Sequence, residues 1–171
     1  MIEFMVIALP RSGTTWAANW LCTDTTLCIH DPLYERHYAE LDHIKSKKRI
    51  GVSCTGLWRF PKWVNGHTAR KVILHRSVDE INESLTELGF PAVPESDADM
   101  LDAIEGIHVD WRALFDDPKI MYEYLLDKPF DAERHQELKS MAIQPEFATL
   151  KTDRTACKRL MDELRSIAGG N

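Results

Sequence analysis

A glycine flanked by hydroxyl and basic side chains follows the first apolar run of the chain, and this composition is typical of an anion-binding turn. The run from Phe4 to Leu9 predicts a buried strand, and Pro-Arg-Ser-Gly-Thr-Thr-Trp follows it at residues 10–16. Gly13 permits close approach of the backbone to a ligand, and a helix beginning at about Thr14 would add its N-terminal amides and its dipole. We therefore expect an anion, such as a phosphate group, to bind at this turn.

The turn differs from the phosphate loop of kinases and nucleotide hydrolases, whose pattern is G-x-x-x-x-G-K-[ST]. Ala8 takes the place of the first glycine, Thr14 takes the place of the lysine, and the basic residue Arg11 precedes Gly13. A γ-phosphate carries about two negative charges and is usually held by Mg²⁺ together with that lysine. The departure favours a transferred group of lower charge, such as a sulfuryl group, which can be moved without a metal.

Polar residues also follow the next three predicted strands. They are His30–Glu35 after the second strand, Cys54 and Thr55 after the third, and Arg76 after the fourth. In open parallel sheets, ligands bind outside the carboxyl ends of the strands. The sequence therefore predicts one cleft shared by four strand ends.

Strands alternate with helices along the chain, and this order predicts a parallel sheet covered on both faces. Ser77 and Glu80 form an S-x-x-E capping box that begins one helix, and Gly89 ends it. The 171 residues suffice for one domain, with a divergent helical segment at 135–171. We expect strands at 4–9, 27–29, 50–54, 71–74 and 107–111, and helices at 14–21, 77–89, 97–105, 118–126 and 155–168.

Residues 10–16 closely resemble the 5′-phosphosulfate loop of the sulfotransferases that use 3′-phosphoadenosine-5′-phosphosulfate (PAPS), whose usual pattern is P-[KR]-S-G-T-T-W. The 3′-phosphate signature of that family is a strand ending in Arg with a Ser eight residues later, and it is matched by Arg76 and Ser84. Looser similarities lie at 30–33, 108–118 and 124–131, so the resemblance covers about residues 4–135. It implies a three-layer α/β fold of the P-loop NTPase type, with a five-stranded parallel sheet flanked by helices.

The resemblance also implies a role for each residue of the two motifs. PAPS would be the cofactor and adenosine 3′,5′-bisphosphate (PAP) the product, and no metal is expected. Arg11 would stabilise charge on the leaving phosphate. The remaining cofactor-binding residues would be Ser12, Gly13, Thr14 and Thr15 at the 5′-phosphate, Arg76 and Ser84 at the 3′-phosphate, and Trp16 and Trp111 at the adenine.

The general base must come from a different place than in the cytosolic small-molecule members of that family. Those members carry a histidine after the third strand, in K-T-H, whereas this chain has Ser53-Cys54-Thr55. Other members use a carboxylate that follows the first helix, and His30, Asp31 and Glu35 occupy that region here. We rank Asp31 first, then Glu35, then His30.

The net charge and the cysteine content narrow the classes of function that this protein could have. A net charge of −6 argues against broad binding to nucleic acid or to anionic membranes, and no run approaches the roughly 20 apolar residues of a membrane span. The four cysteines form no C-x-x-C pair and no zinc-ligand spacing, as expected for reduced thiols in a cytoplasmic protein. The expected partner is therefore a small-molecule or glycan acceptor with a hydroxyl or amine.

Two other functions remain open at this point. One is a small P-loop kinase or nucleotide hydrolase, although Leu27-Cys-Ile-His-Asp31 is the nearest approach to an apolar strand ending in a magnesium-binding Asp. The other is a nucleotide-binding protein of the same fold that has lost its chemistry. The C-terminal cofactor loop typical of the sulfotransferases, K-G-x-x-G-[DE]-W, is absent from the sequence, and this favours the second alternative.

Overall fold

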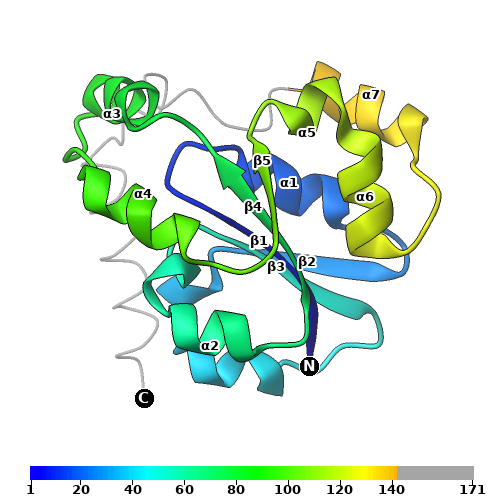
Figure 1. Ribbon diagram of the computed structural model, residues 1–171. Coiled ribbons are helices and arrows are strands. Elements are labelled where there is room, and N and C mark those ends of the chain that lie inside the picture. Colours follow the sequence, from blue (N-terminus) through cyan, green and yellow to red (C-terminus); the bar gives the residue numbers. More distant parts are fainter. Residues whose placement is uncertain (142–171) are drawn as a thin grey trace, which may run out of the picture.

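A five-stranded sheet organises the protein, and all of its strand pairings are parallel (Figure 1). The computed structural model describes residues 1–141, and the strand order is β2-β3-β1-β4-β5. This confirms the predicted sheet, and each strand lies within two residues of its expected bounds. The strands are β1 (Ile2–Ala8), β2 (Thr26–His30), β3 (Arg49–Cys54), β4 (Arg70–His75) and β5 (Ile107–Asp110).

Helices cover both faces of the sheet and make three layers. Side chains alternate along β1, so Met5 and Ile7 join one buried cluster while Phe4 and Val6 join the other. The first cluster lies under α2 (Pro61–Gly66), α3 (Val78–Glu87) and α4 (Glu95–Asp102). The second lies under α1 (Thr14–Leu21), α5 (Ala113–Asp116), α6 (Pro118–Leu126) and α7 (Ala132–Ser140), as Figure 1 shows.

The observed helices have the predicted bounds where a capping residue or a proline fixes one end. The predicted helix 118–126 begins at Pro118 and ends at Leu126 as expected. The predicted helix 97–105 corresponds to α4, which begins two residues earlier and ends three residues earlier than expected. Helices α2 and α7 were not predicted, because α2 is short and α7 buries only His135. Three 3₁₀ turns, η1 (Pro32–Tyr34), η2 (Tyr38–His43) and η3 (Leu57–Arg59), complete the described part.

The expected capping box at the start of α3 forms only in part. The Ser77 hydroxyl accepts a hydrogen bond from the amide of Glu80, at 3.2 Å, as the motif requires. The carboxylate of Glu80 binds the guanidinium groups of Arg76 and Arg112 instead of returning to the Ser77 amide. Stronger charged partners therefore replace the second bond of the box.

Two sequence predictions lie outside the described residues: the helix at 155–168, and most of the segment 135–171. Within residues 1–141, no helix has both the length and the apolar character that crossing a membrane requires.

The topology opens a crevice at the carboxyl ends of the adjacent strands β1 and β3. The chain leaves β1 towards α1 on one face of the sheet, whereas it leaves β3 towards η3 and α2 on the other face. Adjacent strands whose connections diverge in this way leave space between the two loops, where open α/β sheets bind their ligands. The predicted anion-binding turn lies at the first of these loops, and Thr55 lies at the second.

Gly51 of β3 offers a test of how tightly the central strands pack. A Cβ atom at this position would lie 2.0 Å from Cε2 of the fully buried Phe4 ring. We expect Gly51→Ala to lower the free energy of unfolding by about 1–3 kcal/mol, the usual cost of overpacking a core, measured by urea denaturation. Gly66→Ala is the control, because nothing lies within 4 Å of its added Cβ. A Gly51→Ala protein as stable as Gly66→Ala would contradict this packing.

Candidate functional site

The turn after β1 contains two residues with left-handed backbone conformation. Gly13 has φ = 84° and Arg11 has φ = 62°. Both values lie in the left-handed region, which glycine adopts readily and other residues rarely adopt. A Cβ atom on Gly13 would also come within 2.7 Å of Leu114. The Ser53 hydroxyl in β3 donates a 2.8 Å hydrogen bond to the Thr14 carbonyl and fixes the start of α1. The sequence prediction of a glycine-dependent turn leading into a helix is therefore confirmed in geometry.

The two sequence motifs meet in space. Nε of Arg11 donates a hydrogen bond to Oγ of Ser84 at 2.9 Å, across 73 positions of sequence. Arg76 donates a hydrogen bond to the Arg11 carbonyl oxygen. The end of β4 and the second turn of α3 thus contact the turn after β1 directly. Two guanidinium groups and one hydroxyl lie together at this point, which is a suitable set of donors for an anion.

Arg76 is held by a small charged and aromatic network. Its guanidinium lies 4.7 Å from the centre of the Trp111 ring and binds Glu80 at 3.1 Å. Arg112 binds the same carboxylate, and hydrogen bonds from Arg112 and then from Arg76 lower the pKa of Glu80. Glu80 is therefore a stable anion that balances the charge of Arg76. An incoming phosphate would compete with this carboxylate for Arg76.

His30 and Asp31 lie beside the turn, at the end of β2. The Nε2 atom of His30 lies 3.2 Å from the hydroxyl oxygens of both Thr14 and Thr15 and 3.3 Å from the Asp31 carboxylate. Asp31 is buried, with φ = 42°, and its Oδ1 atom accepts hydrogen bonds from the amide (2.6 Å) and the hydroxyl (3.0 Å) of Thr55. A carboxylate and an imidazole are thus placed against the predicted anion site.

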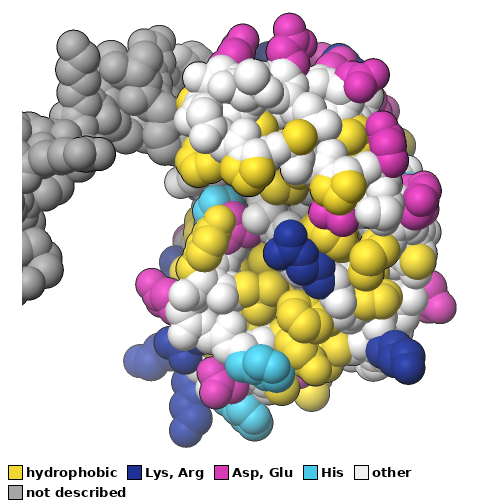
Figure 2. Space-filling view, turned by 90° about the vertical axis from the view of Figure 1, so that its left-hand side faces the viewer, with side chains coloured by type: hydrophobic (Ala, Val, Ile, Leu, Met, Phe, Trp, Pro, Cys, Tyr) yellow, Lys and Arg dark blue, Asp and Glu magenta, His cyan; other side chains and the backbone are white. Residues whose placement is uncertain are grey.

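The cleft has two connected lobes at this edge of the sheet, of about 710 and 620 Å³. Figure 2 faces the side of the molecule where the strands end, and basic side chains there stand in a hollow bordered by hydrophobic ones. The lobes share five lining residues, namely Pro10, Asp31, Tyr34, Thr55 and Arg59. The phosphate-loop lobe extends over Arg11, Gly13, Thr14, Thr15 and His30 to the loop 90–94. The second lobe, which we call the acceptor lobe, extends over Leu33, Glu35, Arg36, His37, Tyr38, Cys54, Gly56 and Phe60.

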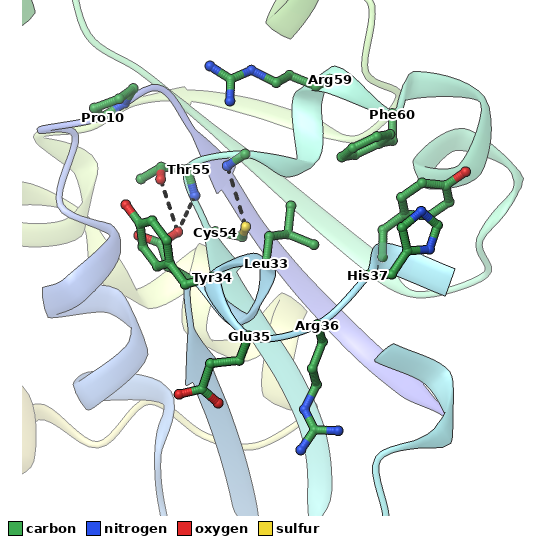
Figure 3. Close-up of a pocket in the computed structure, with 13 residues that line it drawn as sticks. Pro10, Leu33, Tyr34, Glu35, Arg36, His37, Cys54, Thr55, Arg59 and Phe60 are labelled. Atoms are coloured by element: carbon green, nitrogen blue, oxygen red, sulfur yellow. Dashed lines mark hydrogen bonds between the residues drawn. The ribbon is translucent and has the colours of Figure 1, made fainter. Parts of the chain in front are cut away.

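The predicted site residues do not all face this cleft, and Arg76, Ser84 and Trp111 line neither of its two lobes. Glu35 lines the acceptor lobe, but Figure 3 shows its carboxylate pointing away from Thr55 and Cys54. Trp16 is 7% exposed and packs against Trp20 in the core, at 5.3 Å between ring centres. Ser12 is fully buried below the turn, so its side chain is enclosed by protein.

Sequence reasoning did not identify several residues that shape the acceptor lobe. Tyr34 is 86% exposed at its rim, and Tyr38 stacks on Phe60 at 4.3 Å between ring centres. Arg59 reaches over the lobe in Figure 3. Phe60 lines the lobe, whereas the neighbouring Trp58 is buried in the core. The run Leu57-Trp-Arg-Phe60 was the available signal, since it places a cation between aromatic side chains.

No family model, no curated protein and no solved structure matches this chain. The resemblance to PAPS-dependent sulfotransferases therefore depends on the residues of the two motifs and on their geometry. The structure itself shows a five-stranded parallel α/β fold with a two-lobed cleft at the carboxyl ends of its strands.

Cys54 lines the acceptor lobe, and its environment makes it a poor nucleophile. Burial raises the pKa of the Cys54 thiol to about 12, so at pH 8 roughly one thiol in 10,000 is ionised. We expect iodoacetamide to modify the partly exposed Cys22 at least about 100-fold faster than Cys54, as measured by peptide mass spectrometry. Both should react at similar rates in urea. Equal rates in the folded protein would show that Cys54 is open to solvent and ionisable.

Proposed function

We propose that this protein transfers a sulfuryl group from PAPS to a hydroxyl or amine of a small-molecule or glycan acceptor. The observation that carries the proposal is the contact between the two motifs: Arg76 and Ser84, at the 3′-phosphate positions, bind Arg11 of the predicted 5′-phosphosulfate loop. Two phosphate sites in contact with each other suit a nucleotide that carries phosphates at both the 5′ and 3′ positions. ATP and ADP have no group for the second site.

The charges near the turn suit such a ligand without a metal. The 5′-phosphosulfate would accept hydrogen bonds from the amides at the start of α1 and from the hydroxyls of Thr14 and Thr15. Arg76 would exchange its contact with Glu80 for the 3′-phosphate, and it lies against the Trp111 ring. We infer that the adenine stacks near Trp111, since Trp16 is enclosed in the core.

The chemistry requires one proton acceptor and one charge stabiliser. The acceptor oxygen or nitrogen attacks the sulfur atom, a new bond to sulfur forms, and the bond between sulfur and the bridging phosphate oxygen breaks. Arg11 would stabilise the charge that builds on the departing 5′-phosphate, so that PAP leaves. The proton of the acceptor would pass to Asp31, beside which Thr55 and His30 lie.

The acceptor lobe suits a ligand with an apolar body and polar groups. Its floor and rim carry Leu33, Tyr34 and Phe60, and Arg59 stands above them. The lobe meets the phosphate-loop lobe at Asp31 and Thr55. A hydroxyl entering through the acceptor lobe would therefore reach the sulfuryl group beside the proposed base.

A phosphoryl-transfer enzyme is the second candidate, and the position of Asp31 favours it. A buried carboxylate at the end of β2, next to a phosphate-binding turn, could hold a hydrated Mg²⁺ ion. The absence of a lysine at position 14 argues against this function, because ATP-using loops employ that lysine to hold the β- and γ-phosphates. A protein that only binds the nucleotide is the third candidate, and it would bind PAP without turning over PAPS.

Arg76→Ala tests the proposed 3′-phosphate site. A hydrogen bond to a charged group contributes about 1.5–3 kcal/mol, so the substitution should weaken PAP binding roughly 10- to 100-fold. Ser84→Ala should cost less, about 0.5–1.5 kcal/mol, because a hydroxyl is a neutral donor. Calorimetric titrations in EDTA measure both effects, and wild-type protein should bind PAP there as well as it does in Mg²⁺.

The matched control is 5′-AMP, which lacks the 3′-phosphate. Its weak binding should be unchanged in both variants. A wild-type protein that binds 5′-AMP as tightly as PAP, or an Arg76→Ala protein that loses both ligands equally, has no 3′-phosphate site. A strict Mg²⁺ requirement, with ATP bound in preference to PAP, would favour the phosphoryl-transfer candidate.

Asp31→Asn and Glu35→Gln separate the two carboxylates proposed as base. Only Asp31 lies at the junction of the two lobes, so we expect Asp31→Asn to lower kcat by about 10²-fold or more and Glu35→Gln to change it less than about threefold. The assay follows label transfer from radiolabelled PAPS to a panel of phenols, alcohols, amines and sugars. PAP affinity should stay within about threefold of wild type in both variants. A large loss of kcat in Glu35→Gln alone would reverse this assignment.

A further inference from the structure

Two histidines and an aspartate converge on the side of β4 away from the turn, and the proposed function uses none of them. They are His75 at the end of β4, Asp102 at the end of α4 and His108 in β5. Each offers one ligand atom, and these three atoms lie within 4.8 Å of one another. Nitrogen Nε2 of His75 lies 2.7 Å from Nδ1 of His108, and Nδ1 of His75 lies 3.4 Å from Oδ1 of Asp102.

When both histidine rings of this cluster are neutral, their hydrogen bonds leave two acceptor atoms facing each other. The Nε2 atom of His108 lies 2.7 Å from the Ile104 carbonyl, which can only accept, so the neutral His108 ring carries its proton there and a lone pair on Nδ1. His75 must then donate from Nε2 to that lone pair. A neutral His75 ring is left with a lone pair on Nδ1, which faces the Asp102 carboxylate at 3.4 Å. Two acceptors facing each other repel unless a cation lies between them.

A proton on Nδ1 of His75 is one way to supply that cation, but the surroundings oppose it. Burial lowers the pKa of His75, and the neighbouring His108 lowers it further, although Asp102 and Asp110 act in the opposite direction. The nearby Asp110 is shared with Arg112. The neutral imidazole is the form that binds metals, so a metal ion and a proton would compete for Nδ1 of His75.

We propose that His75 and Asp102 bind a divalent transition-metal ion of the zinc class, with His108 as the residue that holds the His75 ring in the required tautomer. The separation of 3.4 Å between Nδ1 and Oδ1 is close to the edge of a tetrahedron with metal–ligand bonds of about 2.0–2.1 Å. A histidine ligand usually donates its other nitrogen to a partner, and His108 takes that part. Water completes the coordination, because Asp102 is exposed.

The ion would connect three elements that are distant in sequence. It would join the ends of β4 and α4, and through His108 it would also fix β5. The residue after His75 is Arg76, and the Trp111 amide donates to the His75 carbonyl at 2.8 Å. A bound ion would therefore stabilise the edge of the sheet beside the proposed nucleotide site, and its binding does not depend on whether PAPS is the substrate.

The test is a titration of the full chain, stripped with EDTA and dialysed, with ZnCl₂ in a calorimeter at pH 7.5. We expect one ion per chain, a rise in melting temperature, and progressively weaker binding as the pH falls and protons compete with the ion for the imidazole nitrogen. Mg²⁺ in excess should not compete, because it prefers oxygen ligands. His75→Ala should weaken binding at least about 100-fold, and Asp102→Asn and His108→Ala about 10-fold or more.

Matched variants distinguish this site from adventitious binding. His43→Ala and Asp99→Asn remove an exposed histidine and an exposed aspartate of α4 outside the cluster, and they should leave Zn²⁺ affinity within about twofold. His108→Asn places an oxygen acceptor near the Nδ1 position and should recover part of the affinity that His108→Ala loses. Co²⁺ in place of Zn²⁺ should give a spectrum without a thiolate charge-transfer band, since no cysteine takes part.

Three results would overturn the proposal. One is a wild-type protein that binds no stoichiometric Zn²⁺. Another is a His75→Ala or Asp102→Asn protein that binds Zn²⁺ as well as wild type. The third is a thiolate band with Co²⁺, which would assign the metal to the cysteines instead. None of these results would change the PAP titrations, so the two proposals fail independently.

Discussion

The position of β1 at the centre of the sheet is the constraint on which the rest of the structure depends. Every one of its residues except Glu3 is buried, and it pairs with β3 on one side and β4 on the other. The chain can leave this strand only through a sharp turn, and Gly13 supplies the left-handed conformation that the turn needs. Because the neighbouring strands are parallel to β1, their ends surround the same turn, and the polar residues that follow them are brought to it.

A second constraint is electrostatic. The predicted phosphate site holds two arginines close together, and their positive charges require a nearby counter-charge. Glu80 does so for Arg76, and Arg112 shares the same carboxylate. This network explains why the capping box of α3 is incomplete, because Glu80 gains more from two guanidinium groups than from one backbone amide. An anion that replaced Glu80 at Arg76 would leave this carboxylate paired with Arg112.

The sequence predicted those features that depend on local order. The turn at residues 10–16, the strand ends and the Arg76–Ser84 spacing are all visible in short runs of residues. Contacts between distant segments could not be read in the same way. The bond from Arg11 to Ser84 spans 73 positions, and the enclosure of Trp16 depends on Phe115 of α5 and on His135 of α7. Helix α7 itself lacks an amphipathic pattern, since it buries one histidine and no apolar run.

The same limit applies to the histidine cluster. A search for ligand spacing tests residues that are close in sequence, whereas His75, Asp102 and His108 come from two strands and a helix. Parallel pairing of β4 with β5 sets Ile73 opposite His108, and only this register brings His108 to within hydrogen-bond distance of His75. Consecutive residues at the end of β4 thus face different partners, since Arg76 contacts the turn after β1 and His75 contacts β5. Anything that fixes the His75 side of this strand end also restricts the position of Arg76 beside the turn after β1.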